Sequence, residues 1–191
     1  MKQENKVLVI VDMQNDFIDG SLANKDAEAI VPGICKLVKQ WKGPIICTKD
    51  THYENYLDTQ EGKNLPIKHC IKNSEGWEVN SQIMEALKER DAAFSKGSLN
   101  RTTFVEKGSF GYKGWGQISV FNYIGAESEV VFVGTCTDIC VISNVLNFKT
   151  EYPYIPVTVY GNLCAGLTRE KHAAALDVMQ SCQVNVIHYG E

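Results

Sequence analysis

Four residues that can take part in chemistry stand where short aliphatic stretches of the sequence end. Asp12, Asp50 and Lys107 each close such a stretch, and Cys140 follows another by one short turn. If these stretches are strands of a parallel sheet, their carboxyl ends meet at one edge, so that carboxylates, an amine and a thiol converge there. Taken singly, each residue has an ordinary explanation as a cap, a surface charge or a core side chain. Taken together, they indicate nucleophilic catalysis by the thiol.

Cys140 has the strongest local case as a nucleophile. The preceding stretch ends near Gly134, and Thr137 and Asp138 are residue types that favour the start of a helix. Cys140 then falls in the first helical turn, where the helix dipole and the free N–H groups favour a thiolate. The same N–H groups can hold an oxyanion formed on a substrate carbonyl. We therefore expect a thiolate nucleophile beside an oxyanion site.

A second group of chemically capable residues lies around the polar stretch 53–78, which shows no sustained hydrophobic period. Asp50 and His52 precede this stretch and His69 lies within it, next to Cys70. A carboxylate with two imidazoles suits zinc, iron or manganese and leaves positions open for water. The same spacing fits two loop histidines bonded to backbone carbonyls equally well, so both interpretations stay open at this point.

The elements that must position these residues follow from hydrophobic periodicity. Short runs rich in Val and Ile predict parallel strands at 6–12, 44–50, 129–135, 155–160 and 183–188, with a weaker one at 102–107. Apolar residues at helical spacing predict helices at 27–41, 79–90, 114–124, 139–149 and 168–181. Strands that alternate with helices imply right-handed crossovers and a parallel sheet covered on both faces. The sequence therefore predicts a single doubly wound α/β domain over residues 1–191, with about six strands.

Composition and charge exclude several classes of protein. The chain has 191 residues, of which 44% are hydrophobic and 22% charged, as in an ordinary globular domain. Its formal charge of −4 offers no cationic field for nucleic acid. The longest aliphatic run, Val7 to Val11, is far shorter than a membrane helix. Seven cysteines with no C-x-x-C pair indicate reduced thiols. We expect a cytoplasmic protein with neither nucleic acid nor membrane as a partner.

Motifs that cover nearly the whole chain also carry a family resemblance. They are Val9 to Phe17, Asp50 to His52, His69 to Ile71, Lys107-Gly108, Gly134 to Val141 and Cys164 to Leu176. In order and spacing they resemble the motif series of the isochorismatase-like cysteine hydrolases, the nicotinamidases in particular. The resemblance implies the same doubly wound fold, hydrolysis of a small-molecule amide through a thioester, and assembly into homo-oligomers.

The catalytic and metal positions of that family match six residues of this chain. They are Asp12, Lys107 and Cys140 for the catalytic triad, and Asp50, His52 and His69 for the metal. The resemblance thus implies a divalent transition metal as cofactor, with zinc first and iron or manganese as alternatives.

The resemblance also assigns residues to the oxyanion site and to the substrate pocket. The bond from Thr135 to Cys136 matches a cis peptide bond that is not followed by proline in the family. That bond would turn the N–H groups of Cys136 and Cys140 toward the oxyanion. Phe17 matches a residue that lines the substrate ring, and Gln14 is near it, so both residues are candidates for substrate contact.

The chain departs from the nicotinamidase pattern at two positions of the pocket. Pro66 stands where many relatives have a Trp against the substrate ring, and Trp77 and Tyr56 are candidates to replace it. Asp58 stands in the region where some relatives have another metal-binding His. The intact metal set favours a metal-containing amidase, with nicotinamide as the first substrate. The alternatives are isochorismatase-like or N-carbamoyl hydrolysis, and a catalytically silent protein that binds a small molecule.

Overall fold

The computed structural model describes residues 6–94, 101–122, 125 and 127–190, which form one six-stranded sheet. In chain order the strands are β1 (Lys6–Val11), β2 (Ile45–Asp50), β3 (Thr102–Lys107), β4 (Glu129–Thr135), β5 (Val157–Ala165) and β6 (Asn185–Ile187). Their order in the sheet is β3-β2-β1-β4-β5-β6, and every neighbouring pair is parallel. The predicted doubly wound α/β fold is confirmed. The direction of winding reverses between β1 and β4, where ligands bind in sheets of this kind.

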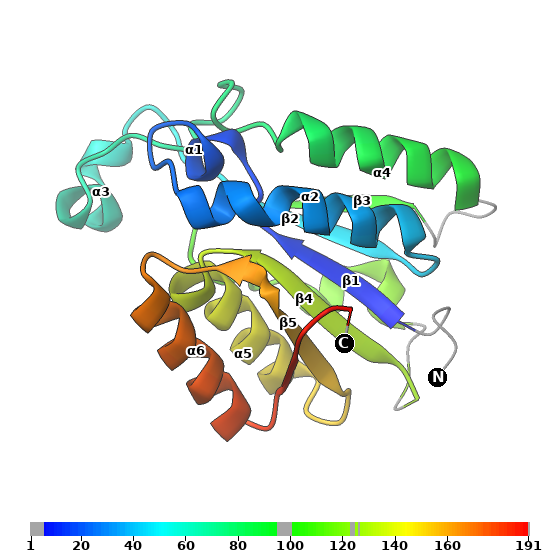
Figure 1. The fold of residues 1–191 in the computed structure, drawn as a ribbon. Helices are drawn as coiled ribbons and strands as arrows, with labels where there is room; N and C mark the ends of the chain where they lie inside the picture. Colours follow the sequence, from blue (N-terminus) through cyan, green and yellow to red (C-terminus); the bar gives the residue numbers. More distant parts are fainter. Residues whose placement is uncertain (1–5, 95–100, 123–124, 126, 191) are drawn as a thin grey trace.

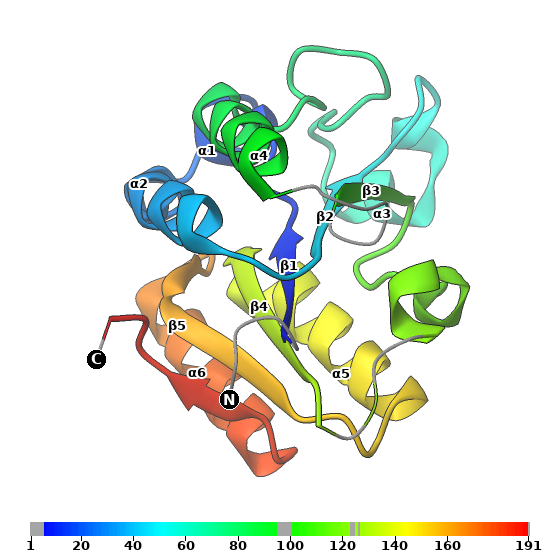
Figure 2. The same cartoon turned by 90° about the vertical axis from the view of Figure 1, so that its right-hand side faces the viewer.

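Helices cover both faces of this sheet. They are α1 (Asn15–Ile18), α2 (Lys25–Gln40), α3 (Gln60–Asn64), α4 (Ser81–Phe94), α5 (Ile142–Glu151) and α6 (Arg169–Ser181). Figures 1 and 2 show α2 and α4 on one face and α5 and α6 on the other, while the short α3 lies outside both layers. Over the described residues, no helix is long and apolar enough to cross a membrane.

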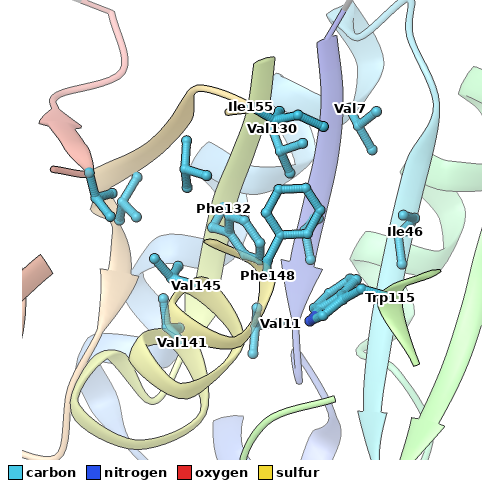
Figure 3. Packing of buried hydrophobic residues seen from close by; sticks show 14 of the residues in the cluster. Val7, Val11, Ile46, Trp115, Val130, Phe132, Val141, Val145, Phe148 and Ile155 are labelled. Carbon is cyan, nitrogen blue, oxygen red and sulfur yellow. The ribbon is translucent and has the colours of Figure 1, made fainter. Parts of the chain in front are cut away.

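The burial of each strand explains how clearly it was predicted. β1, β2 and β4 are buried at nearly every position because helices cover both of their faces, which gives continuous aliphatic runs. β3 is an edge strand with exposed side chains at Phe104 and Glu106, so its sequence pattern is weaker. One core cluster fills the face under α5, where Phe132, Phe148 and Trp115 pack edge to face (Figure 3).

One predicted helix is wrong. Instead of a single helix over 114–124, the chain makes two short 3₁₀ turns, Trp115–Gln117 and Ser119–Asn122, while residues 123 and 124 lie outside the described part. Gly116 weakens a regular helix here, and the fully buried Trp115 ring is held by its place in the core rather than by a helical period. The other predicted elements are confirmed with shifted ends, the largest shift being the extension of β5 to Ala165.

A glycine allows the two central strands to meet at the point where the winding reverses. Gly134 of β4 lies opposite Val11 of β1 and has a φ of +122°, a backbone conformation that side chains disfavour. A Cβ atom at this position would lie 2.2 Å from the Val11 carbonyl oxygen. The absence of a side chain therefore permits the close approach of the strand ends that carry Asp12 and lead to Cys140.

The core packing predicts a large effect for Phe148→Ala. Phe148 is fully buried and its ring packs against Trp115, Phe121, Phe132 and Tyr152. Because truncation removes this burial and leaves a cavity, we expect the free energy of unfolding to fall by about 3–5 kcal/mol in urea denaturation. Tyr154→Ala, at a position that is 87% exposed, is the control and should change it by less than about 0.5 kcal/mol. Equal effects of the two substitutions would contradict this account of the core.

Candidate active site

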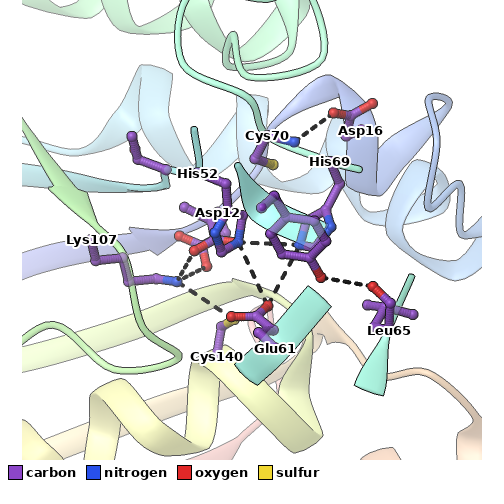
Figure 4. A network of polar contacts seen from close by, with 12 residues as sticks. Asp12, Asp16, His52, Glu61, Leu65, His69, Cys70, Lys107 and Cys140 are labelled. Atoms are coloured by element: carbon purple, nitrogen blue, oxygen red, sulfur yellow. Dashed lines mark hydrogen bonds and ion pairs between the residues drawn. The ribbon is translucent and has the colours of Figure 1, made fainter. Parts of the chain in front are cut away.

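The predicted chemistry-bearing residues converge at the carboxyl ends of the strands. Asp12 follows β1 directly, Asp50 ends β2, and Lys107 ends β3 as the register partner of Asp50. Cys140 lies after β4 in a π-helical turn, Thr137–Val141, that runs into α5. Figure 4 shows the side chains of Asp12, Lys107 and Cys140 close together. The parallel register thus brings together residues that are up to 128 positions apart, from Asp12 to Cys140.

The Lys107 ammonium is the centre of this arrangement. Its Nζ lies 2.7 Å from Asp12 Oδ2, 3.2 Å from Asp50 Oδ1 and 3.6 Å from Cys140 Sγ. The Lys107 and Asp12 side chains are 1% and 0% exposed. A buried ammonium requires such anionic partners because it has lost its hydration. Lys107 therefore joins the carboxylates to the thiol in one network.

Thr48 fixes the carboxylate of Asp12. The Thr48 hydroxyl donates to Asp12 Oδ1 at 2.6 Å, and the Asp12 N–H lies 3.3 Å from the Thr48 carbonyl oxygen. Asp12 has a φ of +48°, in the left-handed region that non-glycine residues seldom occupy. Burial raises the pKa of Asp12 and, with the charge of Asp50, outweighs the lowering effect of Lys107. A carboxylate with a raised pKa is a stronger base than an exposed one.

Opposing effects act on the pKa of the Cys140 thiol. Burial, followed by the charge of Asp12, raises this pKa well above its ordinary value, although Lys107 opposes the shift. Burial by itself would lower the pKa of Lys107, but the charges of Asp12, Cys140 and Asp50 raise it well above its usual range. The effect of the helix start, which favours a thiolate, is thus opposed by burial. A thiol with a raised pKa needs a base to become a nucleophile.

The turn that carries the nucleophile is fixed to its neighbours by polar contacts. Asn144 Nδ2 donates to the Cys140 carbonyl oxygen at 2.8 Å. A hydrogen bond of 2.8 Å joins Thr137 Oγ1 to Nδ1 of His172, a half-buried histidine on α6. The Thr135–Cys136 peptide bond is cis, as the family resemblance implied. These contacts hold Cys140 in place relative to the end of β4.

A candidate metal centre lies beside this network. Asp50, His52, His69 and Glu61 each offer a ligand atom, and all of these atoms lie within 4.8 Å of one another. His52 Nε2 is 3.0 Å from Asp50 Oδ2 and 3.6 Å from Glu61 Oε1. Burial alone would raise the pKa of Asp50, but hydrogen bonds to His52 and His69 and the charge of Lys107 bring it well below its ordinary value. The three predicted ligands are thus brought together with a fourth.

Glu61 is the ligand candidate that the sequence interpretation missed. It lies in α3, whereas Asp58 lies exposed in the preceding 3₁₀ turn and is not part of the cluster. The available signal is Thr59, whose hydroxyl accepts the N–H of Gly62 as a helix cap. Recognising that cap places Glu61 in the first turn of a short helix, although its approach to the histidines depends on the fold of the whole loop.

The donor set fits a divalent transition metal. Two imidazoles and two carboxylates are ligands suited to zinc, and to iron or manganese. Among the side chains of the combined network, three carboxylates (Asp12, Asp50 and Glu61) face one ammonium (Lys107). A divalent cation balances the two negative charges that remain. The residues present therefore fit the group that the sequence interpretation expected.

Gln14 and Asp16 connect the long polar loop to the end of β1 through hydrogen bonds. Gln14 Nε2 donates to the carbonyl oxygens of Asp50 and Trp77, and its Oε1 accepts the Asp50 N–H at 2.7 Å. Asp16 Oδ2 accepts the N–H of Cys70, next to the candidate ligand His69, at 2.7 Å. Gln14 is fully buried and its amide is occupied by these bonds. The structure thus places it behind Asp50, away from the position of substrate contact that was predicted for it.

A small cavity opens onto both the thiol and the ligand cluster. Its volume is about 180 Å³, and Cys140, Asp50, His69 and Phe17 are among the residues that line it. Phe17 thus has the place predicted for it. Trp77 and Tyr56, the predicted replacements for an aromatic wall, are not among the lining residues. The Tyr56 ring lies behind the two histidines, and the Trp77 indole donates to the Thr51 hydroxyl.

The doubly wound parallel sheet, with a thiol, an ammonium and a carboxylate at its strand ends, agrees with what the family resemblance of the sequence implied. The family model of the isochorismatase domain matches residues 6–190 of the chain. The chain therefore belongs to the isochorismatase family.

Comparison with individual proteins shows which members of the family the chain is similar to. The chain is 25% identical to the nicotinamidase/pyrazinamidase of Mycobacterium tuberculosis over an alignment of 193 positions, which covers 95% of this chain and 98% of that protein. It is 32% identical to the nicotinamidase of Saccharomyces cerevisiae over 111 residues, which span 42% of this chain and only half of that protein. The crystal structure of a pyrazinamidase of Pyrococcus horikoshii in complex with zinc matches with a TM-score of 0.75 and 22% identity, covering 97% of this chain and 99% of that one. Within the family, the chain is thus similar to nicotinamidases and pyrazinamidases.

The ligand geometry predicts that Glu61→Gln weakens metal binding. We expect the purified protein to contain about one transition-metal ion per chain by elemental analysis, and the substitution to reduce zinc affinity by at least about 10-fold in chelator competition. Affinity should also fall as the pH is lowered, because the imidazoles of His52 and His69 must be neutral to bind. Glu54→Gln, at an exposed position of the same loop, is the matched control. Equal zinc affinity in both variants would remove Glu61 from the ligand set.

Proposed function

We propose that the protein is a metal-dependent cysteine amidohydrolase that cleaves a small neutral amide, with nicotinamide as the first substrate to test. One observation carries the proposal. The Cys140 thiol and three of the four candidate metal ligands, Asp50, Glu61 and His69, line the same cavity of about 180 Å³. A substrate held there faces a nucleophile and a Lewis-acid site at the same time.

The proposed steps follow from the contacts among Asp12, Lys107 and Cys140. Asp12 takes the proton of the Cys140 thiol, and the sulfur attacks the amide carbonyl carbon. The backbone N–H groups of Cys136 and Cys140 hold the oxyanion. Asp12 returns the proton to the departing nitrogen, which leaves as ammonia, and the acyl group stays on sulfur as a thioester. Water then adds to the thioester and gives the carboxylic acid and the free thiol.

Lys107 supports these steps without exchanging a proton. Its raised pKa keeps it an ammonium, so its charge stabilises the sulfur as the thiol loses its proton. It also orients the Asp12 carboxylate through their 2.7 Å contact. A metal held by Asp50, His52, Glu61 and His69 would supply a Lewis acid for a lone pair of the substrate. Zinc is our first choice of metal, since the pyrazinamidase from P. horikoshii is described in complex with zinc.

The size and polarity of the cavity support a small neutral substrate. Its volume is below the range of about 300–1,000 Å³ that is usual for drug-sized ligands. Its polar lining residue outside the ligand cluster is Asn24, which donates to the Gly166 carbonyl oxygen and accepts the N–H of Asp26. No lysine or arginine is among the described residues that line it. Isochorismate and N-carbamoyl amino acids carry carboxylates that would find no lysine or arginine there, so a neutral amide is the first substrate class to test.

The buried network supports catalysis over the alternative of a catalytically silent protein. A protein that only binds a small molecule has no need of a buried base, ammonium and thiol in contact.

All seven cysteines are free thiols, as is usual in a reducing compartment. We therefore assign the reaction to the cytoplasm.

The first test concerns the nucleophile. We expect Cys140→Ala to abolish amide hydrolysis, by at least about 10³-fold in kcat, because a methyl group cannot form the thioester. Cys164→Ala removes a buried thiol outside the network and should retain activity. Circular dichroism and urea denaturation should show that both variants fold. Wild-type turnover by Cys140→Ala would refute the assignment.

The second test concerns the substrate. We expect the zinc-loaded enzyme to convert nicotinamide to nicotinate with release of one ammonia, measured by a coupled ammonia assay and by chromatography of the product. Removal of the metal with a chelator should lower the rate, and zinc should restore it. If the loaded enzyme acted on another small amide but not on nicotinamide, the proposed reaction would stand and this substrate would be rejected.

A further inference from the structure

A half-exposed aromatic residue, Phe110, is part of the cavity wall. Phe110 lies in the loop after β3, three residues beyond Lys107. Phe110 is 50% exposed, yet it also lines the inner cavity of about 180 Å³. A large apolar ring in this position gains burial when a flat ligand lies against it.

The same ring also lines a larger outer pocket. This pocket has a volume of about 560 Å³ and includes His52, Gln60 and Ser109 in its wall. The residues that belong to both the outer pocket and the inner cavity are Glu61, Leu65, Phe110 and Ile139. These four side chains therefore form the partition between the two spaces. Phe110 is the largest of them and the one with an aromatic face.

The position of Phe110 is fixed relative to the nucleophile by one buried side chain. Asn144 Nδ2 donates to the carbonyl oxygens of Phe110, at 3.2 Å, and of Cys140, at 2.8 Å. Asn144 Oδ1 accepts the N–H of Tyr112 at 2.9 Å, and Asn144 is fully buried. One amide thus sets the spacing between the partition and the sulfur. The partition is part of the preformed site rather than a free surface loop.

Of the other aromatic residues near the inner cavity, Phe17 lines it and Tyr56 does not. Phe17 lines the inner cavity and lies against His69, with 5.7 Å between the ring centroids. Tyr56 is fully buried, and its hydroxyl donates to the Leu65 carbonyl oxygen. Phe17 and Phe110 are therefore the two aromatic side chains in the cavity wall, apart from the His69 imidazole, among the residues that the structure describes.

We propose that Phe110 is the specificity-determining residue of the site: it forms the second aromatic wall of the inner cavity and limits the substrate to a single flat ring. The proposal rests on the proposed amidohydrolase function and adds to it a limit on substrate size. Without the phenyl group, the inner cavity opens into the outer pocket. The protein would then accept amides on fused two-ring systems that the wild-type cavity excludes.

Binding measurements test this proposal separately from catalysis. All proteins carry Cys140→Ala and are loaded with zinc, so that nicotinamide and quinoline-3-carboxamide bind without turnover and calorimetry gives their dissociation constants. We expect the added Phe110→Ala to weaken nicotinamide binding by about 3- to 10-fold, the usual worth of an aromatic contact. It should strengthen binding of the two-ring amide, and Phe110→Tyr should restore the wild-type preference. Phe104→Ala, at a 43% exposed Phe of β3 that lines neither space, is the matched control.

The outcomes separate the two proposals. A reversed preference between the one-ring and two-ring ligands in the Phe110→Ala protein supports the role of Phe110. An equal change for both ligands, no change, or no binding of either ligand by any variant would overturn it. Failure of the amidohydrolase function shows differently, as intact ligand binding together with no ammonia release by the protein that retains Cys140.

Discussion

The buried ammonium of Lys107 is the interaction on which the rest of the site depends. An ammonium that is 1% exposed at its side chain is tolerated only with anionic partners, and the parallel register supplies them from neighbouring strands. Asp12 comes from the end of β1 and Asp50 from the end of β2. Because both carboxylates lie against one positive charge, neither strand end can shift without leaving a charge unpaired. The fold and the chemistry are therefore held by the same contacts.

Asp50 connects the catalytic network to the metal centre. One carboxylate oxygen lies 3.2 Å from Lys107 Nζ and the other 3.0 Å from His52 Nε2. A metal ion at the cluster would draw negative charge away from Lys107, which would leave more of the ammonium field for Asp12 and Cys140. The candidate metal ligands and the Cys140 thiol thus share one cavity and one set of charges.

Two side chains that follow β1, Gln14 and Asp16, hold the long polar segment after β2 in place. Gln14 binds the backbone of Asp50 and Trp77, and Asp16 binds the N–H of Cys70. A short parallel bridge between His52 and Ile71 closes the loop on itself. These bonds bring His69 back to Asp50 across a stretch with no hydrophobic period of its own. The residues after Asp12 therefore hold the candidate metal ligands in place, while Asp12 itself contacts Lys107.

The sequence by itself determined the sheet and the convergence of Asp12, Asp50, Lys107 and Cys140 at one edge of it. It did so because buried parallel strands require continuous aliphatic runs, and because their carboxyl ends must meet at one edge. The family resemblance added roles for these residues that periodicity alone does not supply.

Only the tertiary structure decided the remaining features of the site. The raised pKa of Cys140, the presence of Glu61 rather than Asp58 in the candidate metal cluster, the place of Gln14 behind Asp50, and Phe110 as a cavity wall all depend on contacts between distant segments. The same is true of Trp115, whose burial in the core replaces a predicted helix with two short turns. A local sequence pattern specifies which face of an element is apolar. It does not specify how far a thiol is removed from water or which loop side chain arrives beside it, because both depend on packing between elements.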